Sequence, residues 1–301
     1  MLIWRFRDGK PGHENQTRGL VQALAARCSL DVHDIDVPAA GQAVWWWATR
    51  RFPPGEGLPD PDLILGAGHA THLPMLAARR ARGGRIVLLM KPSLPIAWFD
   101  LCLIPEHDAP PEAPNVLVTR GVLNPVRPAP VKDPAQGLIL LGGPSRHHDW
   151  PVDVILEQVR AVVQGTPGVR WEVTDSRRSP PAALARLAEF DLPGVTCHPW
   201  QETPPGWLAE RLARAGRVWV SEDSVSMLYE ALTAGAAVGL LEVPRRLRGR
   251  VVQGVETLVR EGLVTPFHAW QGGAPLKPPA RPLDEAGRCA EAILARGWCC
   301  D

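Results

Sequence analysis

The chain has 301 residues, of which 45% are hydrophobic and 22% charged, and its 33 Lys and Arg nearly balance its 32 Asp and Glu. This composition excludes a disordered chain, and a formal net charge of +1 lacks the basic excess of a nucleic-acid-binding domain, so we expect no nucleic acid partner. No apolar run reaches the ~20 residues of a membrane span, no secretion signal opens the chain and the six Cys form no CxxC pair, so we expect a cytoplasmic protein without structural zinc.

Short apolar runs, typical of buried parallel strands, alternate with helical patterns along the chain. The predicted strands are Leu2–Phe6, Leu63–Leu65, Ile86–Met90, Leu101–Ile104, Leu138–Leu141, Trp171–Val173, Val218–Val220 and Val238–Leu241. One predicted helix face carries Thr17, Leu20, Val21, Leu24 and Cys28, and another carries Val154, Ile155, Val159 and Val162. Strand–helix alternation with short connections predicts an α/β fold.

A proline-rich segment from Pro125 to Pro134 interrupts this alternation near the middle of the chain. It predicts a linker between two α/β domains of similar size, residues 1–130 and residues 131–301. A last helix is expected at Asp284–Arg296. Because open parallel sheets bind ligands beyond the carboxyl ends of their strands, the loops after the strands are the candidate sites.

The loop after the first strand reads Asp-Gly-Lys-Pro-Gly-His-Glu-Asn-Gln from Asp8 to Gln16. Its glycines, Gly9 and Gly12, permit a tight turn into a helix whose N-terminus is partly positive. His13 lies where a general base would be placed, because a histidine side chain titrates near neutrality. The alternative is an ordinary strand–helix turn with an exposed histidine.

The strand at Leu138–Leu141 is followed by Gly142, Gly143, Ser145 and Arg146. A glycine pair at a strand end lets the backbone approach a phosphate closely, and the serine and arginine would act as donors. This loop is therefore a candidate phosphate site.

The strand at Trp171–Val173 is followed by Ser176, Arg177 and Arg178. Guanidinium groups bind oxyanions bidentately, so this loop is a second candidate for a phosphate or nucleobase site. The alternative is a solvated, charged turn.

The segment 217–235 predicts a strand, an acidic turn and a helix that ends at a glycine. Asp223 or Ser224 is placed as the N-cap, and Ser226 and Glu230 share a helix face because they are four residues apart. The start of such a helix can hold a diphosphate, and a carboxylate one turn further on can accept both ribose hydroxyls. The alternative is an ordinary cap with a surface carboxylate.

These motifs together resemble the mitochondrial fission Elm (elongated mitochondria) family, whose members occur in bacteria and plants. The resemblance extends over nearly the whole chain and rests on Asp8–Gln16, Pro105–Asp108, Asn115–Thr119, Ser176–Arg178 and residues 223–230. The chain departs from the family pattern at His198-Pro199-Trp200 and Gly68-His69-Ala70. That family is similar to GT-B glycosyltransferases, so the resemblance implies two Rossmann-like domains facing a cleft, with the C-terminal helix packing back on the first.

The resemblance also implies a metal-independent transfer of a sugar from a nucleotide-diphosphate donor to an acceptor such as a lipid-linked or glycan molecule of the cell envelope, without a cofactor. His13 would be the base, and the second domain would hold the donor, with Glu230 on the ribose. The residues expected to bind substrate are Asp8, Lys10, Gly12, Gly142, Gly143, Ser145, Arg146, Ser176, Arg177, Arg178, Asp223, Ser224, Ser226, Met227 and Glu230. Two alternatives stay open: a catalytically silent nucleotide-binding or protein-interaction scaffold, and a nucleotide-sugar epimerase.

Three consecutive tryptophans, Trp45, Trp46 and Trp47, precede Arg50 and Arg51. Consecutive side chains point in different directions, so one core cannot bury all three and at least one should be exposed. Tryptophan favours the headgroup boundary of a bilayer, and arginine is attracted to anionic lipids. The segment predicts peripheral contact with the inner face of a membrane, with core or inter-domain packing as the alternative.

Overall fold

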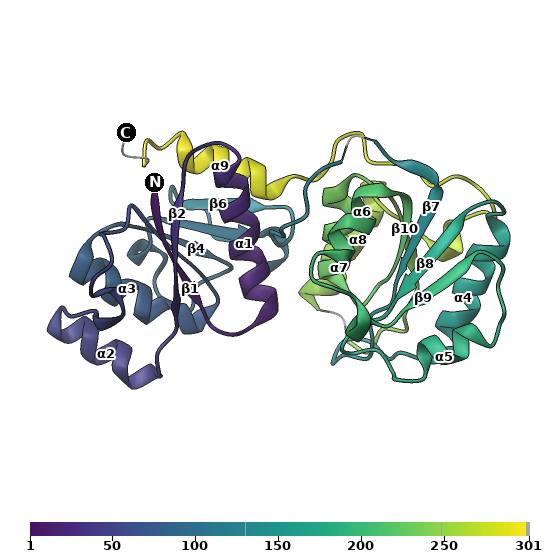
Figure 1. Ribbon diagram of the computed structural model, residues 1–301, viewed down its shortest axis with the longest axis horizontal. Helices are drawn as coiled ribbons and strands as arrows, with labels where there is room; N and C mark the ends of the chain where they lie inside the picture. Colours follow the sequence, from purple (N-terminus) through teal and green to yellow (C-terminus); the bar gives the residue numbers. More distant parts are fainter. Residues whose placement is uncertain (130, 248, 299–301) are drawn as a thin grey trace. The chain divides into compact units, whose positions relative to one another are not determined.

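A computed structural model describes residues 1–129, 131–247 and 249–298 (Figure 1). The chain forms two compact units, one of Met1–Pro125 with Glu285–Asp301 and the other of Val126–Asp284. The predicted domain boundary at residue 130 falls outside the described residues, and the structure divides the chain after Pro125. The range 131–301 expected for the second domain is too long at its end, because the last helix packs in the first unit.

The first unit contains a six-stranded parallel sheet in the order β2-β1-β3-β4-β5-β6. Its strands are β1 (Leu2–Arg7), β2 (Asp31–Asp36), β3 (Leu63–Ala67), β4 (Arg85–Leu89), β5 (Leu101–Pro105) and β6 (Val116–Thr119). Its helices are α1 (Pro11–Ala25), α2 (Ala40–Thr49), α3 (His72–Arg82) and α9 (Glu285–Leu294). The strand order reverses between β1 and β3, so the loops after these two strands flank the position where such sheets bind ligands.

Alternate residues of these strands fill cores on the two faces of the sheet. Ile3 packs with residues of α1 and α9, whereas Trp4 packs with Trp46 of α2 and Met75 of α3. This two-sided burial explains why the central strands read as continuous apolar runs, as parallel strands do.

Helix α9 lies beside α1 (Figure 1), as expected for the C-terminal helix. Its Cys289 and Ile293 are fully buried in the same cluster as Leu20 and Leu24 of α1. At its first residue, the Glu285 carboxylate accepts a hydrogen bond from the Arg120 amide at 2.9 Å. The chain therefore returns to the first unit after completing the second.

The second unit contains another six-stranded parallel sheet, in the order β12-β11-β10-β7-β8-β9. Its strands are β7 (Asp133–Leu140), β8 (Arg170–Thr174), β9 (Val195–His198), β10 (Ala215–Ser221), β11 (Ala237–Leu241) and β12 (Thr265–Pro266). Its helices are α4 (Val152–Gly165), α5 (Ala183–Ala188), α6 (Trp207–Arg214), α7 (Val225–Ala234) and α8 (Arg250–Arg260). The strand order reverses between β7 and β10, which is the Rossmann arrangement.

All eight strands predicted from apolar runs are present, with ends that differ by a few residues. The predicted face of α4 is wrong at one position, because Val154 is exposed while Ile155, Val159 and Val162 are buried. Within the described residues, no helix is long and apolar enough to cross a membrane. That the loops of both units face one cleft stays a prediction.

Candidate functional site

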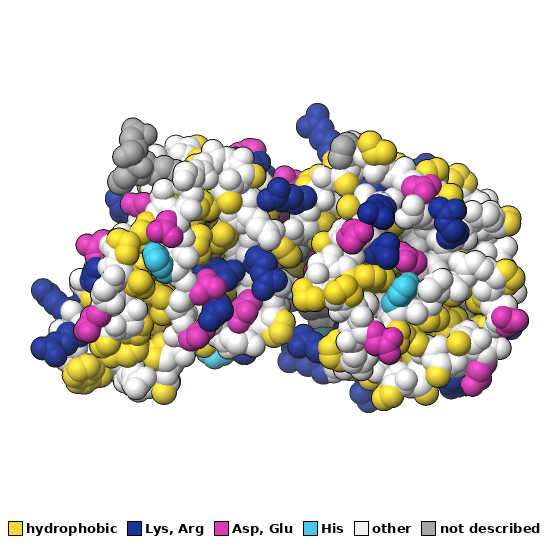
Figure 2. Space-filling view, in the orientation of Figure 1, with side chains coloured by type: hydrophobic (Ala, Val, Ile, Leu, Met, Phe, Trp, Pro, Cys, Tyr) yellow, Lys and Arg dark blue, Asp and Glu magenta, His cyan; other side chains and the backbone are white. Residues whose placement is uncertain are grey.

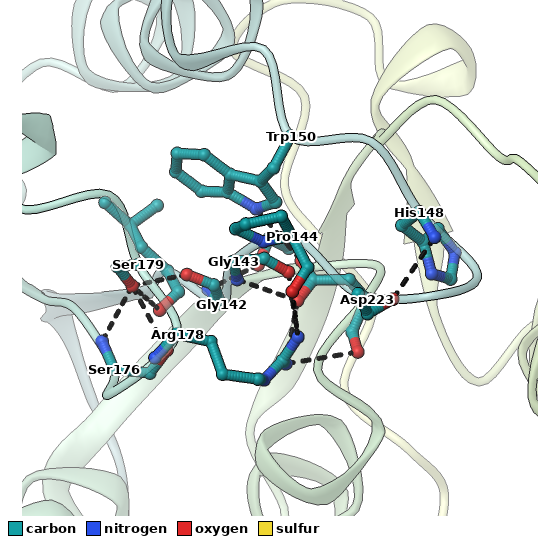
Figure 3. Close-up of polar contacts among 12 residues, drawn as sticks. Gly142, Gly143, Pro144, His148, Trp150, Ser176, Arg178, Ser179 and Asp223 are labelled. Carbon is teal, nitrogen blue, oxygen red and sulfur yellow. Dashed lines mark hydrogen bonds and ion pairs between the residues drawn. The ribbon is translucent and has the colours of Figure 1, made fainter.

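The carboxylate of Asp223 ties together the loops at the reversal point of the second sheet (Figure 3). Its side chain has no exposed surface. It accepts hydrogen bonds from the Gly143 amide at 2.9 Å, the Trp150 indole at 3.0 Å and the Arg178 guanidinium at 2.8 Å. Three donors satisfy this buried charge, so Asp223 acts as a structural tie rather than as the helix cap considered from the sequence.

The glycine pair after β7 is needed for this loop-on-loop packing. A Cβ on Gly142 would overlap with the Asp223 carboxylate, and one on Gly143 would overlap with the Arg178 backbone. Moreover, the Gly142 amide donates to Ser221 Oγ at 2.7 Å, and the Gly143 amide donates to Asp223. Both amides expected to approach a phosphate are therefore already used inside the protein.

The rest of that loop also turns inward on itself. Ser145 Oγ accepts the amides of His147 and His148 at 3.2 and 3.1 Å. Arg146 is exposed and donates from Nε to the His147 ring at 2.8 Å. The structure therefore brings Gly142 and Gly143 against Asp223 and Arg178, whereas the side chains of Ser145 and Arg146 bond to His147 and His148 of their own loop.

A cavity of about 530 Å³ lies beyond the carboxyl ends of β8 and β9, at the start of α7. It is lined by Ser176, Arg177, Arg178, Ser224, Ser226 and Met227, all predicted from the sequence, and by Thr174, Asp175, Trp200, Thr203, Trp207 and Leu208, which were not. We call this the α7 pocket. Its wall thus joins segments from three separate parts of the chain.

The start of α7 lines the α7 pocket with Ser224, Ser226 and Met227. Ser224 occupies the N-cap position, but its hydroxyl caps no helix amide. The first bond of the helix is from the Leu228 amide to the Ser224 carbonyl. As at the start of any α-helix, the preceding amides, from Val225 to Met227, have no acceptor within the helix, and they carry the positive end of the helix dipole.

The two adjacent arginines have different roles. Arg178 donates from Nη1 to the Gly143 carbonyl at 2.8 Å and from Nη2 to Asp223 (Figure 3). Its guanidinium is therefore held by the loops that Asp223 joins. Arg177 is exposed on the wall of the α7 pocket, and no described residue forms a hydrogen bond or ion pair with its side chain. Of the two, Arg177 is the cation available to a ligand.

Glu230 lies one turn beyond Ser226 on α7 and is half-buried. Burial raises the pKa of its carboxyl to about 7. No described side chain forms a hydrogen bond or ion pair with this carboxyl, so its charge is uncompensated in the protein alone. A half-buried acid without a partner is typical of a functional position.

The sequence did not predict the tryptophans that line the α7 pocket, because it did not predict strand β9. Trp200 lies two residues after the end of β9 and is 36% exposed, and its amide donates to the Asp175 carboxylate at 2.8 Å. Trp207 at the start of α6 is buried, with its ring 4.9 Å from that of His198. In the sequence, only the departure from the family pattern at residues 198–200 indicated that this segment differs.

In the first unit, His13 and Asp8 form a pair at the reversal point between β1 and β3. His13 Nδ1 lies 2.8 Å from Asp8 Oδ2, and the Asp8 side chain is 2% exposed. A Cβ on Gly68, which follows β3 at φ +81°, would overlap with the imidazole. Because an ionised carboxylate only accepts, Nδ1 of the neutral ring carries the hydrogen and Nε2 presents its lone pair.

The other predicted residues of this loop are more peripheral. Lys10 is exposed, with its Nζ 3.7 Å from Asp8 Oδ2, and Gly12 has open space around it. Among the described residues, no three His, Cys, Asp or Glu side chains gather as a metal site would require. The chemistry available here is that of an oriented histidine.

A comparison with curated proteins finds no match. Among solved structures, a candidate UDP-N-acetylglucosamine 2-epimerase from Listeria monocytogenes has a TM-score of 0.61 at 14% identity, with 98% of this chain and 95% of the other matched. The UDP-GlcNAc 2-epimerase from Neisseria meningitidis, solved with UDP-GlcNAc, has 0.56 at 9% identity, with 98% and 99% matched. The glycotransferase of kitacinnamycin has 0.51 at 15% identity, with 98% of both chains matched. At these identities the likeness shows the fold, which is of the GT-B type with two Rossmann-like domains.

The model of one protein family, mitochondrial fission ELM1, matches residues 11–297. This range includes His13, the α7 pocket, Glu230 and helix α9. The chain therefore belongs to the mitochondrial fission ELM1 family.

Proposed function

We propose that this protein transfers a sugar from a nucleotide-diphosphate donor bound in the α7 pocket to an acceptor hydroxyl. The observation that carries the proposal is the pairing, in one pocket, of an uncapped helix start with the exposed, unpaired Arg177. Helix N-termini and guanidinium groups both favour phosphate oxygens. The pocket also lies beyond the carboxyl ends of parallel strands, where open sheets bind their ligands.

Each part of the donor has a counterpart among the residues of this pocket and helix. The amides from Val225 to Met227 would hold the diphosphate, and Arg177 would neutralise it. The exposed face of Trp200 would stack on the nucleobase, an interaction that does not require a particular base. Glu230 would accept the ribose hydroxyls and would gain, from them, the hydrogen bonds that it lacks in the protein alone.

In the transfer step, the acceptor oxygen attacks the anomeric carbon while the bond from that carbon to the diphosphate oxygen breaks. The proton of the acceptor hydroxyl passes to His13 Nε2, whose ring Asp8 orients. Negative charge grows on the departing diphosphate, where the α7 amides and Arg177 stabilise it without a metal ion. Donor and acceptor roles thus fall to different units of the chain.

Epimerisation of the nucleotide sugar is the second candidate, since it would use the same donor pocket and since two of the similar solved structures bear epimerase names. A silent scaffold that only binds the nucleotide is the third. Incubation with a panel of nucleotide sugars, followed by mass spectrometry of the products, separates the three. Release of free nucleoside diphosphate supports transfer, a changed sugar still joined to its nucleotide supports epimerisation, and binding without turnover supports the scaffold.

Arg177→Ala and Arg146→Ala form a matched pair for this experiment. Both arginines are exposed and follow strands of the second sheet, but Arg177 lines the α7 pocket, whereas Arg146 donates a hydrogen bond to His147 of its own loop. Loss of turnover in Arg177→Ala with retention in Arg146→Ala supports the pocket. Equal losses, or equal retention, would contradict it.

A further inference from the structure

Helix α2 in the first unit has an outward face that lacks charged side chains. The helix reads AGQAVWWWAT, and it buries Ala43 and Trp46 against the core while Val44, Trp45 and Trp47 stay outside. Their exposed fractions are 52%, 54% and 43%. A helix on the surface of a globular protein ordinarily turns charged or polar residues outward, so this face is unusual.

Trp46 marks the boundary between this face and the core. It is 8% exposed and meets Phe52 edge-on, with ring centroids 5.5 Å apart. The expectation that one core cannot bury three consecutive tryptophans is confirmed, because the two neighbours of Trp46 remain exposed. Trp45 and Trp47 are thus exposed because of their positions on α2, and not because the core is poorly filled.

Positive charge surrounds the apolar face. Arg50 and Arg51 follow α2 and are exposed, and Arg80 of α3 places its guanidinium 4.6 Å from the centre of the Trp47 ring. Within residues 1–129, 131–247 and 249–298, no carboxylate pairs with any of these three arginines. No Asp or Glu occurs between residues 37 and 55 or within α3. The neighbouring Arg79 and Arg82, by contrast, are paired with Asp100 and Asp60.

Figure 2 shows hydrophobic side chains next to Lys or Arg side chains at the lower left, where Figure 1 places α2. We call this surface the α2 patch; it consists of Val44, Trp45, Trp47, Arg50, Arg51 and Arg80. Indole rings favour the boundary between headgroups and acyl chains, and unpaired arginines favour anionic headgroups. The α2 patch is therefore better matched by an anionic bilayer than by a neutral protein surface, because a neutral surface would leave the guanidinium charges unpaired.

We propose that the α2 patch docks the protein peripherally on anionic lipid bilayers. Trp45, Trp47 and Val44 enter the interface, while the three arginines lie against lipid phosphates. This inference is independent of the proposed transfer reaction, because docking requires neither a nucleotide nor turnover.

Flotation of the protein with vesicles tests the proposal. The full chain should float with phosphatidylglycerol vesicles at low salt, and far less with phosphatidylcholine vesicles or at high salt. The variant Arg50→Glu/Arg51→Glu should lower the partition constant by about 25-fold or more, because one arginine near such a surface contributes about fivefold. The variant Trp45→Ala/Trp47→Ala should lower it by at least about tenfold.

Matched controls keep the test specific to the patch. Arg160→Glu/Arg214→Glu changes the net charge equally at exposed positions of the second unit, and Val154→Ala removes an exposed apolar side chain there. Both should float like the parent. Trp46→Ala is unsuitable, because Trp46 is buried and its loss would disturb the core.

Three outcomes would overturn the proposal. The parent protein could stay in the lipid-free fraction at low salt, or the control pair could lose flotation as fully as Arg50→Glu/Arg51→Glu. Sedimentation without vesicles could also show a dimer that Trp45→Ala/Trp47→Ala separates, in which case the α2 patch joins two copies of the chain.

Discussion

Replacing Glu230 by glutamine should stabilise the folded protein at alkaline pH. Burial raises the pKa of this carboxyl from 4.5 to about 7, so the folded state holds the proton more tightly than the unfolded chain does. The parent therefore loses stability as the pH rises from 4.5 to about 7, and the loss stays constant above that window. At about 1.4 kcal/mol per pKa unit, the full effect is about 3 kcal/mol.

Glutamine keeps the shape of the side chain and never ionises. Urea unfolding near pH 8 should therefore show Glu230→Gln more stable than the parent by up to about 3 kcal/mol, whereas near pH 4.5 the two should be nearly equal. Glu189→Gln, at an exposed position of the same unit, is the matched control and should follow the parent at both pH values. Burial also lowers the pKa of His72 to about 4, which destabilises the protein as the pH falls below 6.5. Because the parent and Glu230→Gln both contain His72, this opposite effect cancels when their stabilities are compared.

The same variant tests the role of the carboxylate in the site. If Glu230 holds the ribose, Glu230→Gln should bind nucleotides about tenfold more weakly or worse, because a charge-assisted hydrogen bond is worth about 1.5–3 kcal/mol. A gain in stability with a loss of affinity is the expected combination. If Glu230→Gln were no more stable than the parent near pH 8, the assigned burial penalty would be refuted, and unchanged affinity would remove the ribose role.

Four further substitutions test separate residues of the candidate site. Asp223→Ala should lower the free energy of unfolding, measured in urea, by about 2–3 kcal/mol, because three donors lose their shared acceptor. A variant as stable as the parent would refute the structural role given to Asp223. Arg177→Ala should weaken nucleoside diphosphates about tenfold or more in calorimetry while leaving nucleosides unaffected, and equal losses for both would point away from a phosphate contact. His13→Ala should lower turnover about 10²–10⁴-fold at nearly unchanged donor affinity, and full turnover would assign the histidine to structure. Asp8→Asn should also lower turnover, because an amide no longer fixes the histidine tautomer.

The central strands could be predicted from sequence because both faces of each parallel sheet are covered and their residues are uniformly apolar. The edge strands β2 and β9 lack that pattern. β2 reads DVHDID, with only Ile35 buried, and β9 is a short VTCH segment without a fully buried residue. Since β9 was not predicted, Trp200 could not be placed at the carboxyl edge of the sheet beside Arg177.

Within the candidate site, local patterns predicted which loops carry polar residues, and long-range contacts decided what those residues do. Asp223 and Gly143 are 80 positions apart in the chain, and their bond uses up the amide that the glycine pair had suggested for a phosphate. A second bond to Asp223, donated by Arg178, gives Arg178 a different role from Arg177, although the two arginines are adjacent in the sequence. His13 was placed by its loop alone, whereas Gly68, which leaves room for its ring, follows a different strand.

The most direct test of the central claim is a structure of the protein determined with a bound nucleoside diphosphate. We expect the phosphates to lie within hydrogen-bond distance of the amides from Val225 to Met227, with the Arg177 guanidinium against them and Glu230 on the ribose. A nucleotide bound instead along the loop from Gly142 to Arg146, or no nucleotide in the α7 pocket at saturating concentration, would contradict it.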